Sequence, residues 1–198
     1  MNTDQYLKKI RRDILQKRRA LDVQQCSLAG LAVLNLLLAH PFFKQKKLTV
    51  ASYASIHGEI ETKDINLNLQ RLGHILALPK VCDPKQGLME FYSTAALGSA
   101  HEDLICGTYG IQEPSGDPNF LITPDRFDVV LLPLVAFDCR GHRLGMGGGF
   151  YDRFLKKLSD KCRLIGLAHD FQEVARLPKQ EWDMDLDEII TPSRHLIF

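Results

Sequence analysis

The apolar and polar positions along the chain predict helices that alternate with strands. Residues 4–21 repeat apolar side chains at helical spacing and form the first predicted helix. A Leu- and Ala-rich stretch that begins after Asp22 and ends at Ala39 is the second, and further helices are expected at 62–74 and 150–158. Runs rich in apolar, β-branched and aromatic residues predict strands at 47–56, 74–81, 87–93, 127–137, 163–169 and 187–191.

This alternation indicates the fold class. The segment 127–137 is apolar almost throughout, as a central strand covered on both faces should be. Strands that alternate with helices favour a single α/β domain over residues 1–198, with three α/β/α layers, an N-terminal basic helix and a mostly parallel or mixed, Rossmann-like sheet. The turn-rich segment 98–123 is expected to be a long loop.

Composition narrows the class of protein. The 25 basic and 24 acidic residues give a formal charge of +1, so nothing attracts the chain as a whole to nucleic acid or an anionic membrane. The 5 cysteines are scattered without a C-x-x-C pair, which argues against a disulfide framework or a zinc knuckle. No apolar run reaches the roughly 18 residues that span a bilayer. We expect a cytoplasmic monomer that binds small molecules and neither nucleic acid nor membrane.

The first helix carries a cationic face beside its apolar one. At about 100° per residue its basic side chains fall within an arc of about 120°. On the pattern alone, this face is either a solvated run of charges or a set of cations that reaches over a pocket to hold phosphate. The residues are Lys8, Arg11, Arg12, Arg18 and Arg19.

The stretch RLGMGGGFYDRF, residues 143–154, is the main candidate for a ligand-binding loop. It follows the central strand and opens a helix, which is where open α/β sheets bind ligands. Glycines before a helix leave N–H groups unpaired and place no side chain in the way of a phosphate. The loop lacks the Gly-Lys-Ser/Thr of a Walker A motif, and Phe150 stands where a dinucleotide fingerprint needs glycine. A mobile glycine turn without a ligand is the alternative.

Residues 133–155, PLVAFDCRGHRLGMGGGFYDRFL, resemble the signature of the 5-formyltetrahydrofolate cyclo-ligase family. Weaker motifs of the family, KRRAL, GEIET, YGIQEP and EWDMDLDEIITP, occur in the family's order, so the resemblance spans nearly the whole chain. It implies conversion of 5-formyltetrahydrofolate to 5,10-methenyltetrahydrofolate with MgATP as co-substrate and release of ADP and phosphate. A formamide carbon is a poor electrophile, and phosphorylation of the formyl oxygen would let N10 close the ring.

The resemblance also implies a set of ATP and metal contacts. Arg143 and Asp152 would be catalytic, the arginine as a charge clamp and the aspartate as a Mg²⁺ ligand together with Asp183. From the residues alone, Asp152 is placed either to cap the helix or to hold the metal, and Asp183 is either a ligand or an ordinary exposed acid. Lys8 stands next to Leu7, where the family carries lysine. The implied ATP-binding residues are Lys8, Arg11, Arg143, Leu144, Gly145, Met146, Gly147, Gly148, Gly149, Phe150 and Tyr151.

For the folate, the resemblance implies contacts from Glu59, Tyr109, Met146 and Phe150. Glu59 would accept hydrogen bonds from the amino and N–H groups of the pterin, and Tyr109 would stack on the substrate. A loop-capping acid and a turn-packing tyrosine are the alternatives. Met146 and Gly148 stand where some members carry Arg and Lys, so fewer cations would contact the phosphates here.

Other functions stay open on the residues alone. The 7 histidines show no metal-ligand spacing, and His169, after a predicted strand, either lines the pocket or is an ordinary loop residue with its hydrogen bonds satisfied. A different α/β enzyme could hold another phosphate, such as a phosphosugar, in the glycine loop. A nucleic-acid-binding protein could use the first helix, although no aromatic residues alternate with its cations.

Overall fold

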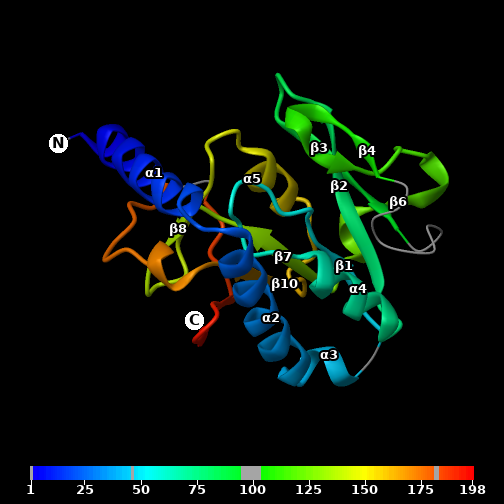
Figure 1. The fold of residues 1–198 in the computed structure, drawn as a ribbon. Helices are drawn as coiled ribbons and strands as arrows, with labels where there is room; N and C mark the ends of the chain where they lie inside the picture. The colour runs from blue at the N-terminus through cyan, green and yellow to red at the C-terminus, as the bar shows by residue number, and fades with distance from the viewer. Residues whose placement is uncertain (1, 46, 95–103, 181–182) are drawn as a thin grey trace.

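An eight-stranded mixed sheet forms the centre of the computed structural model, which describes residues 2–45, 47–94, 104–180 and 183–198 (Figure 1). Five neighbouring strands, from β11 to β2, run parallel, and antiparallel strands lie at the two edges. In order across the sheet the strands are β12 (His195–Ile197), β11 (Glu188–Ile190), β10 (Arg163–Leu167), β7 (Val129–Pro133), β1 (Thr49–Ala51), β2 (Ile75–Asp83), β3 (Leu88–Ser93) and β6 (Leu121–Ile122).

Helices and two small hairpins complete the described chain. The helices are α1 (Thr3–Arg19), α2 (Val23–Ala39), α3 (Phe42–Gln45), α4 (Lys63–Arg71) and α5 (Phe150–Leu155), with 3-10 turns at Thr108–Gly110, Pro118–Phe120, Pro124–Arg126 and Asp170–Gln172. The hairpins pair β4 (Ile105–Cys106) with β5 (Gln112–Glu113) and β8 (Ala136–Phe137) with β9 (Arg143–Leu144). Within the described ranges no single helix has the length and apolar character to cross a membrane; α1 and α2 reach them only as a pair bent by 105°.

The sheet is covered on both faces, which confirms the predicted fold class. Along β7, Val129 and Leu131 pack into the core on the side of α2 and α4, whereas Val130 and Leu132 pack into the core on the side of α5. All four side chains are fully buried because successive residues of a strand point to opposite faces. Figure 1 shows α2 and α4 on one side of the sheet and α5 on the other.

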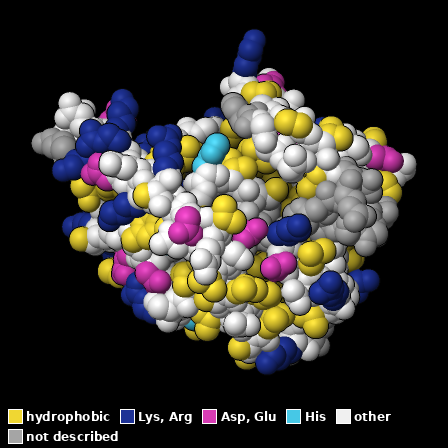
Figure 2. Space-filling model, in the orientation of Figure 1, with side chains coloured by type: hydrophobic (Ala, Val, Ile, Leu, Met, Phe, Trp, Pro, Cys, Tyr) yellow, Lys and Arg dark blue, Asp and Glu magenta, His cyan; other side chains and the backbone are white. Residues whose placement is uncertain are grey.

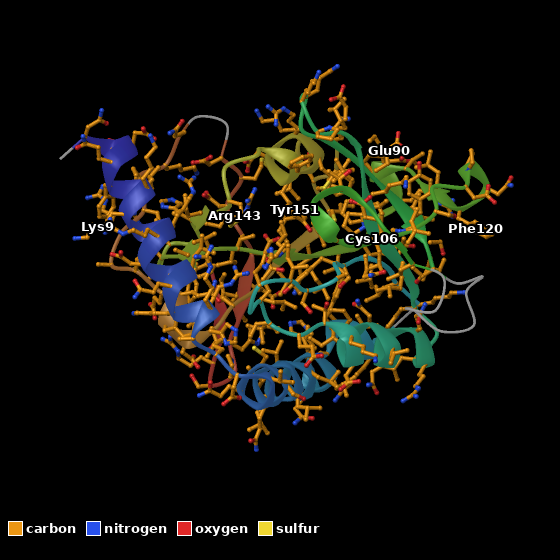
Figure 3. All side chains as sticks on the ribbon, turned by 45° about the horizontal axis from the view of Figure 1, so that its top comes forward. Lys9, Glu90, Cys106, Phe120, Arg143 and Tyr151 are labelled. Carbon is orange, nitrogen blue, oxygen red and sulfur yellow. The ribbon has the colours of Figure 1, made fainter. Side chains whose placement is uncertain are left out.

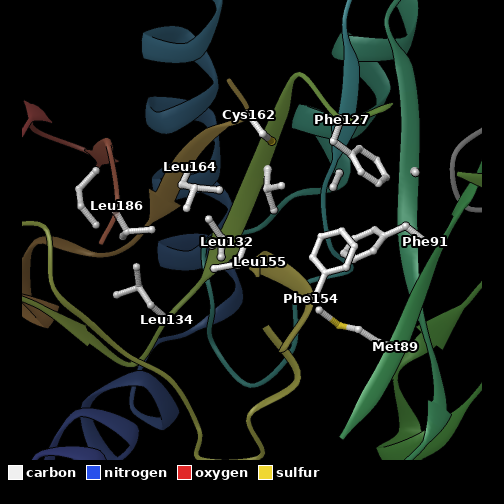
Figure 4. Close-up of a cluster of buried hydrophobic side chains, with 14 of the residues drawn as sticks. Met89, Phe91, Phe127, Leu132, Leu134, Phe154, Leu155, Cys162, Leu164 and Leu186 are labelled. Atoms are coloured by element: carbon white, nitrogen blue, oxygen red, sulfur yellow. The ribbon is translucent and has the colours of Figure 1, made fainter. Parts of the chain in front are cut away.

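The core on the α5 side is built around aromatic rings. Phe154 of α5 lies with its ring centroid 4.5 Å from that of Phe91 on β3 and 5.9 Å from that of Phe127 (Figure 4). This packing holds a helix of only 6 residues against the sheet. Because α5 is too short to be stable alone, these rings fix its position and that of the loop before it.

The structure differs from the predicted elements mainly at three places. The expected strand 127–137 is wrong as one element: after β7 the chain leaves the sheet, and β8 pairs antiparallel with β9. The expected loop 98–123 is wrong over its described part, residues 104–123, which contains β4, β5 and β6; the remainder lies outside the described residues. The edge strand β12 was not expected, since His195–Ile197 is short and polar at its start.

Asp138 fixes the β8–β9 hairpin to the neighbouring chain. Its fully buried carboxylate accepts hydrogen bonds from the backbone N–H groups of Arg140, His142 and Leu177 at 2.9–3.2 Å and from the Arg140 guanidinium at 2.7 Å. Burial alone would raise the pKa of the Asp138 carboxyl, but the hydrogen bonds from Leu177 and Arg140 outweigh it and lower that pKa to about 2.

We therefore predict that Asp138→Asn lowers the free energy of unfolding by about 2 kcal/mol at neutral pH. The folded pKa lies below the unfolded one, so the stabilisation is complete above about pH 4 and is lost as the pH falls through about 2. Urea unfolding of both proteins from pH 7 to pH 2 should show the difference shrinking over that window. Asp125→Asn, at an exposed position, is the matched control; a pH-independent difference for Asp138→Asn would contradict the assignment.

Candidate active site

Three loops meet at the carboxyl edge of the parallel strands. β1 leads to the segment carrying Glu59, β7 to the hairpin and glycine loop, and β10 to His169. These strands are neighbours in the order β10-β7-β1. From β1 the chain passes through α4 to β2 on one side, and from β7 through α5 to β10 on the other, so the winding direction reverses between β1 and β7. Open α/β sheets bind ligands in the crevice at such a point.

Helix α1 lies across the hairpin at this edge. Its apolar residues Leu7, Ile10 and Ile14 are buried in one cluster with Val135 and Leu144. Figure 2 shows Lys and Arg side chains gathered along the outside of α1 at the upper left. The helix therefore packs by its apolar face and presents cations beside it.

Arg11 connects α1 to the glycine loop. Its Nε donates a hydrogen bond of 2.9 Å to the carbonyl oxygen of Gly145. A Cβ added to Gly147 would lie 3.6 Å from the Arg11 guanidinium. The structure thus brings Arg11 to the predicted glycine loop.

The glycine loop has a backbone that favours glycine. Gly147 has φ +102° and Gly149 has φ +70°, in the region that L side chains rarely adopt. A Cβ at Gly148 would lie 2.9 Å from the Phe150 ring. Among the described residues, no backbone carbonyl accepts a hydrogen bond from the N–H groups of Gly147, Gly148 and Gly149. The loop therefore leaves these three donors without a backbone partner.

Arg143 and Asp152 face each other across the loop. The Arg143 Nη2 donates to Asp152 Oδ1 in an ion pair. The Arg143 side chain is 5% exposed and its Nε has no acceptor in the part of the chain that the structure describes, whereas the Asp152 side chain is 33% exposed. A buried guanidinium with one unpaired N–H is suited to bind an anion, and the accessible carboxylate beside it is suited to bind the cation that accompanies that anion.

Glu59 lies close to the end of the glycine loop. Its carboxylate, 11% exposed, pairs with Arg18 Nη2 at 3.2 Å and accepts a bond of 3.1 Å from the N–H of Ile56. Burial raises the pKa of Glu59, while Arg18 and the Ile56 hydrogen bond act in the opposite direction. The pKa values of Tyr53 and Tyr151 are raised by burial and then by the charge of Glu59, which places both phenols around this carboxylate.

Tyr151 links the two halves of the site. Burial raises the pKa of Tyr151, the charge of Glu59 raises it further and the charge of Arg143 lowers it, so both charged groups lie near this phenol. Figure 3 shows Arg143 and Tyr151 between α1 and the β2–β3 hairpin. The acid expected to bind the pterin and the arginine expected to clamp phosphate are thus brought to one region by the fold.

Other predicted residues lie outside these contacts. Lys8 forms an exposed ion pair of 2.8 Å with Asp4, and Leu7 is buried. Asp183 Oδ2 accepts from the N–H of Gln180 at 2.9 Å, and among the described residues no interaction joins it to Asp152. The Tyr109 backbone lies in the turn Thr108–Gly110, and its side chain is outside the described part.

The remaining loop residues take different positions. Leu144 is buried under α1, and Phe150 is partly buried against the core on the α5 side. Met146 is 61% exposed beside the glycines, where it is free to contact a ligand. All three are brought to the loop, with Met146 facing solvent and the other two supporting the backbone.

Arg18 contacts Glu59, a contact that the sequence analysis missed. Arg18 was grouped with the cationic face, read either as a solvated run of charges or as a set of phosphate-holding cations, but the structure buries it to 2% exposure on the same face as Leu7, Ile10 and Ile14. Its spacing of four residues from Ile14 continues the apolar stripe and was the available signal. His169 is a satisfied loop residue, since its Nε2 lies 3.0 Å from the carbonyl oxygen of Gly58.

Fold and site together define an α/β protein with a glycine-rich loop and a buried arginine–carboxylate pair at the switch point of its sheet. The sequence matches the model of the 5-formyltetrahydrofolate cyclo-ligase family over residues 4–192. The chain belongs to this family, which confirms the resemblance seen in its motifs.

Individual relatives agree with the family match. The chain is 36% identical over 182 residues to the 5-formyltetrahydrofolate cyclo-ligase of Escherichia coli K12, covering 91% of this chain and 97% of the relative. It is 34% identical to that of Haemophilus influenzae, with coverage of 96% and 99%. The solved 5,10-methenyltetrahydrofolate synthetase of Aquifex aeolicus superposes with a TM-score of 0.81 at 31% identity, covering 96% of this chain and 92% of that one.

The loop geometry predicts that Gly147→Ala is destabilising and Gly145→Ala is not. A residue other than glycine at φ +102° costs about 1–2 kcal/mol or more, whereas Gly145 has a negative or extended backbone and its nearest neighbour to an added Cβ is 3.8 Å away. Denaturant unfolding of the two variants measures the difference. Equal stabilities would show that the loop relaxes without cost and does not need its left-handed glycines.

Proposed function

We propose that this protein catalyses the conversion of 5-formyltetrahydrofolate to 5,10-methenyltetrahydrofolate with ATP and Mg²⁺, releasing ADP and phosphate. Family membership supports the reaction. The observation that supports the ATP dependence is the glycine loop beside Arg143: among the described residues, its N–H groups have no backbone acceptor and the buried Arg143 Nε has no hydrogen-bond partner.

The residues present fit a triphosphate and a metal ion. The N–H groups of Gly147, Gly148 and Gly149 offer donors to phosphate oxygens, and Arg11 and Arg143 add positive charge. Mg²⁺ would neutralise part of the phosphate charge at this site. Its ligands in the proposal are Asp152, with Asp183 as a second; Lys8, Leu144, Gly145, Met146, Phe150 and Tyr151 complete the proposed ATP site.

The chain's own residues act mainly by placing the reactants. In the proposed sequence the formyl oxygen takes the γ-phosphoryl group, N10 attacks the formyl carbon and loses its proton, and the former formyl oxygen leaves with phosphate. Arg143 holds charge on the transferred group, and Glu59 orients the pterin by accepting its N–H donors. Phe150, Met146 and Tyr109 are proposed to contact the folate. No protein nucleophile is required.

The proposed partners are the reduced folate and ATP alone. A formal charge of +1 supports small-molecule substrates and gives no reason for binding nucleic acid or a membrane surface. We propose a cytoplasmic monomer, in keeping with the cysteines being free in the structure.

The proposal predicts an ATP-dependent rise in the near-ultraviolet absorbance of the methenyl product when the protein is mixed with 5-formyltetrahydrofolate and MgATP. Parallel reactions without ATP, without Mg²⁺ and without folate are the controls. A rise that needs no ATP would contradict the mechanism. Folded protein that stabilises with ATP in a thermal shift but makes no product would point instead to another phosphate-transferring reaction.

The metal assignment predicts that Asp152→Asn raises the Mg²⁺ concentration for half-maximal rate and lowers turnover about 100-fold or more. The amide keeps an oxygen for Arg143 but removes the charge that the cation needs. Asp160→Asn, just beyond α5 and exposed, is the matched control. An unchanged Mg²⁺ dependence in Asp152→Asn would remove Asp152 from the metal site.

A further inference from the structure

The segment from Ile56 to Glu59 is held by two side chains from distant parts of the chain. Arg18 of α1 donates from Nε to the carbonyl of His57 at 2.9 Å and from Nη2 to the carbonyl of Ile56 at 3.0 Å. His169, after β10, lies with Nε2 3.0 Å from the carbonyl of Gly58, so the protonated Nε2 donates to it. Three consecutive carbonyl groups are therefore fixed from outside the segment.

The backbone of this segment is one that needs such support. His57 has φ +50° and Gly58 has φ +70°. A Cβ at Gly58 would lie 2.5 Å from the backbone oxygen of Arg18, so the segment approaches α1 as closely as glycine permits. A residue other than glycine at positive φ persists only where surrounding contacts determine it.

Arg18 holds the carboxylate as well as the backbone. Its Nη2 lies 3.2 Å from Glu59 Oε1, and the other carboxylate oxygen is fixed by the Ile56 N–H at 3.1 Å. Arg18 is 2% exposed and contacts the segment with the planar fork of its guanidinium. One side chain thus sets both the path of the loop and the direction of the carboxylate at its end.

The charged and titratable groups around Glu59 come from every loop at this edge. They are Arg18 from α1, Tyr53 and His57 from the segment after β1, Tyr151 from α5, and His169 after β10. Burial lowers the pKa of His169, and the nearby Arg18 lowers it further, so its ring stays neutral with one N–H to donate. Stacking on Phe171, with centroids 5.1 Å apart and an angle of 8°, fixes the ring plane.

We propose that Arg18 and His169 are positioning residues for the folate site, which clamp the Ile56–Glu59 segment so that the Glu59 carboxylate meets the N–H donors of the reduced pterin. This rests on the proposed function. Neither residue is proposed to contact ATP. Substitution of Arg18 or His169 should therefore weaken folate binding and leave ATP binding unchanged.

The test is the steady-state kinetics of Arg18→Gln beside Arg19→Gln, its exposed neighbour on the same helix. Arg18→Gln should raise the KM for 5-formyltetrahydrofolate about tenfold or more, while the KM for ATP and kcat stay within about threefold. Arg18→Lys, which keeps the charge but not the fork, should lie between. Arg19→Gln should match the unchanged protein.

His169 gives an independent arm for the case that Arg18→Gln does not fold. His169→Ala removes the donor to Gly58 and should raise the folate KM, whereas His169→Gln restores an N–H donor and should bring it back towards the original value. Equal KM values for Ala and Gln variants, or effects that fall equally on the KM for ATP and kcat, would overturn the proposal.

Amide hydrogen exchange separates this proposal from the proposed function. The N–H of Ile56 donates to the Glu59 carboxylate, and the N–H of Glu59 donates to the Ile56 carbonyl. Both amide hydrogens should exchange faster in Arg18→Gln, and their exchange rates should be unchanged in Arg19→Gln. Unaltered exchange overturns the clamp even if the enzyme is active. If the protein without substitutions does not convert 5-formyltetrahydrofolate, the proposed function and the role of Glu59 in folate binding are overturned. Faster exchange in Arg18→Gln would then still establish that Arg18 clamps the segment.

Discussion

The packing of the apolar stripe of α1 on the β8–β9 hairpin is the contact on which the site depends. Leu7, Ile10 and Ile14 bury against Val135 and Leu144, so the helix lies across the carboxyl edge of the sheet. Its position brings Arg11 and Arg18 to two different loops, the glycine loop and the segment before Glu59. Hydrophobic burial is not directional, but because it fixes the position of α1 it also fixes where the guanidinium groups of Arg11 and Arg18 lie.

The order of the strands explains why these loops come together. The loops after β1, β7 and β10 leave the sheet at one edge, and the winding direction reverses between β1 and β7. Glu59 follows β1 and the glycine loop follows β7, and the charges of both Glu59 and Arg143 act on the pKa of Tyr151. The strand order therefore brings the Glu59 carboxylate and the glycine loop to the same edge of the sheet.

Local patterns predicted much of this arrangement and failed where the chain makes long-range choices. The parallel strands, the helices and the glycine loop show in periodicity and glycine spacing. The exit of the chain after Pro133 into β8 does not, because a continuous apolar run looks the same whether it stays in the sheet or turns to bury under another helix. Local patterns also did not predict the burial of Arg18. Its spacing fits the apolar stripe, but a buried charge there needs polar partners, and these lie more than 35 residues away in sequence.

The two arginine–carboxylate pairs at this edge are unlike pairs that serve stability. Arg18 with Glu59 and Arg143 with Asp152 each bury a guanidinium to 5% exposure or less, and each guanidinium has one nitrogen without an acceptor among the described residues. An unmet buried donor costs about 1–3 kcal/mol, and a buried ion pair is often no more stabilising than apolar residues of the same volume. Neither pair is therefore explained by a gain in stability; what each does in this structure is to fix one carboxylate, Glu59 or Asp152, at the carboxyl edge of the sheet.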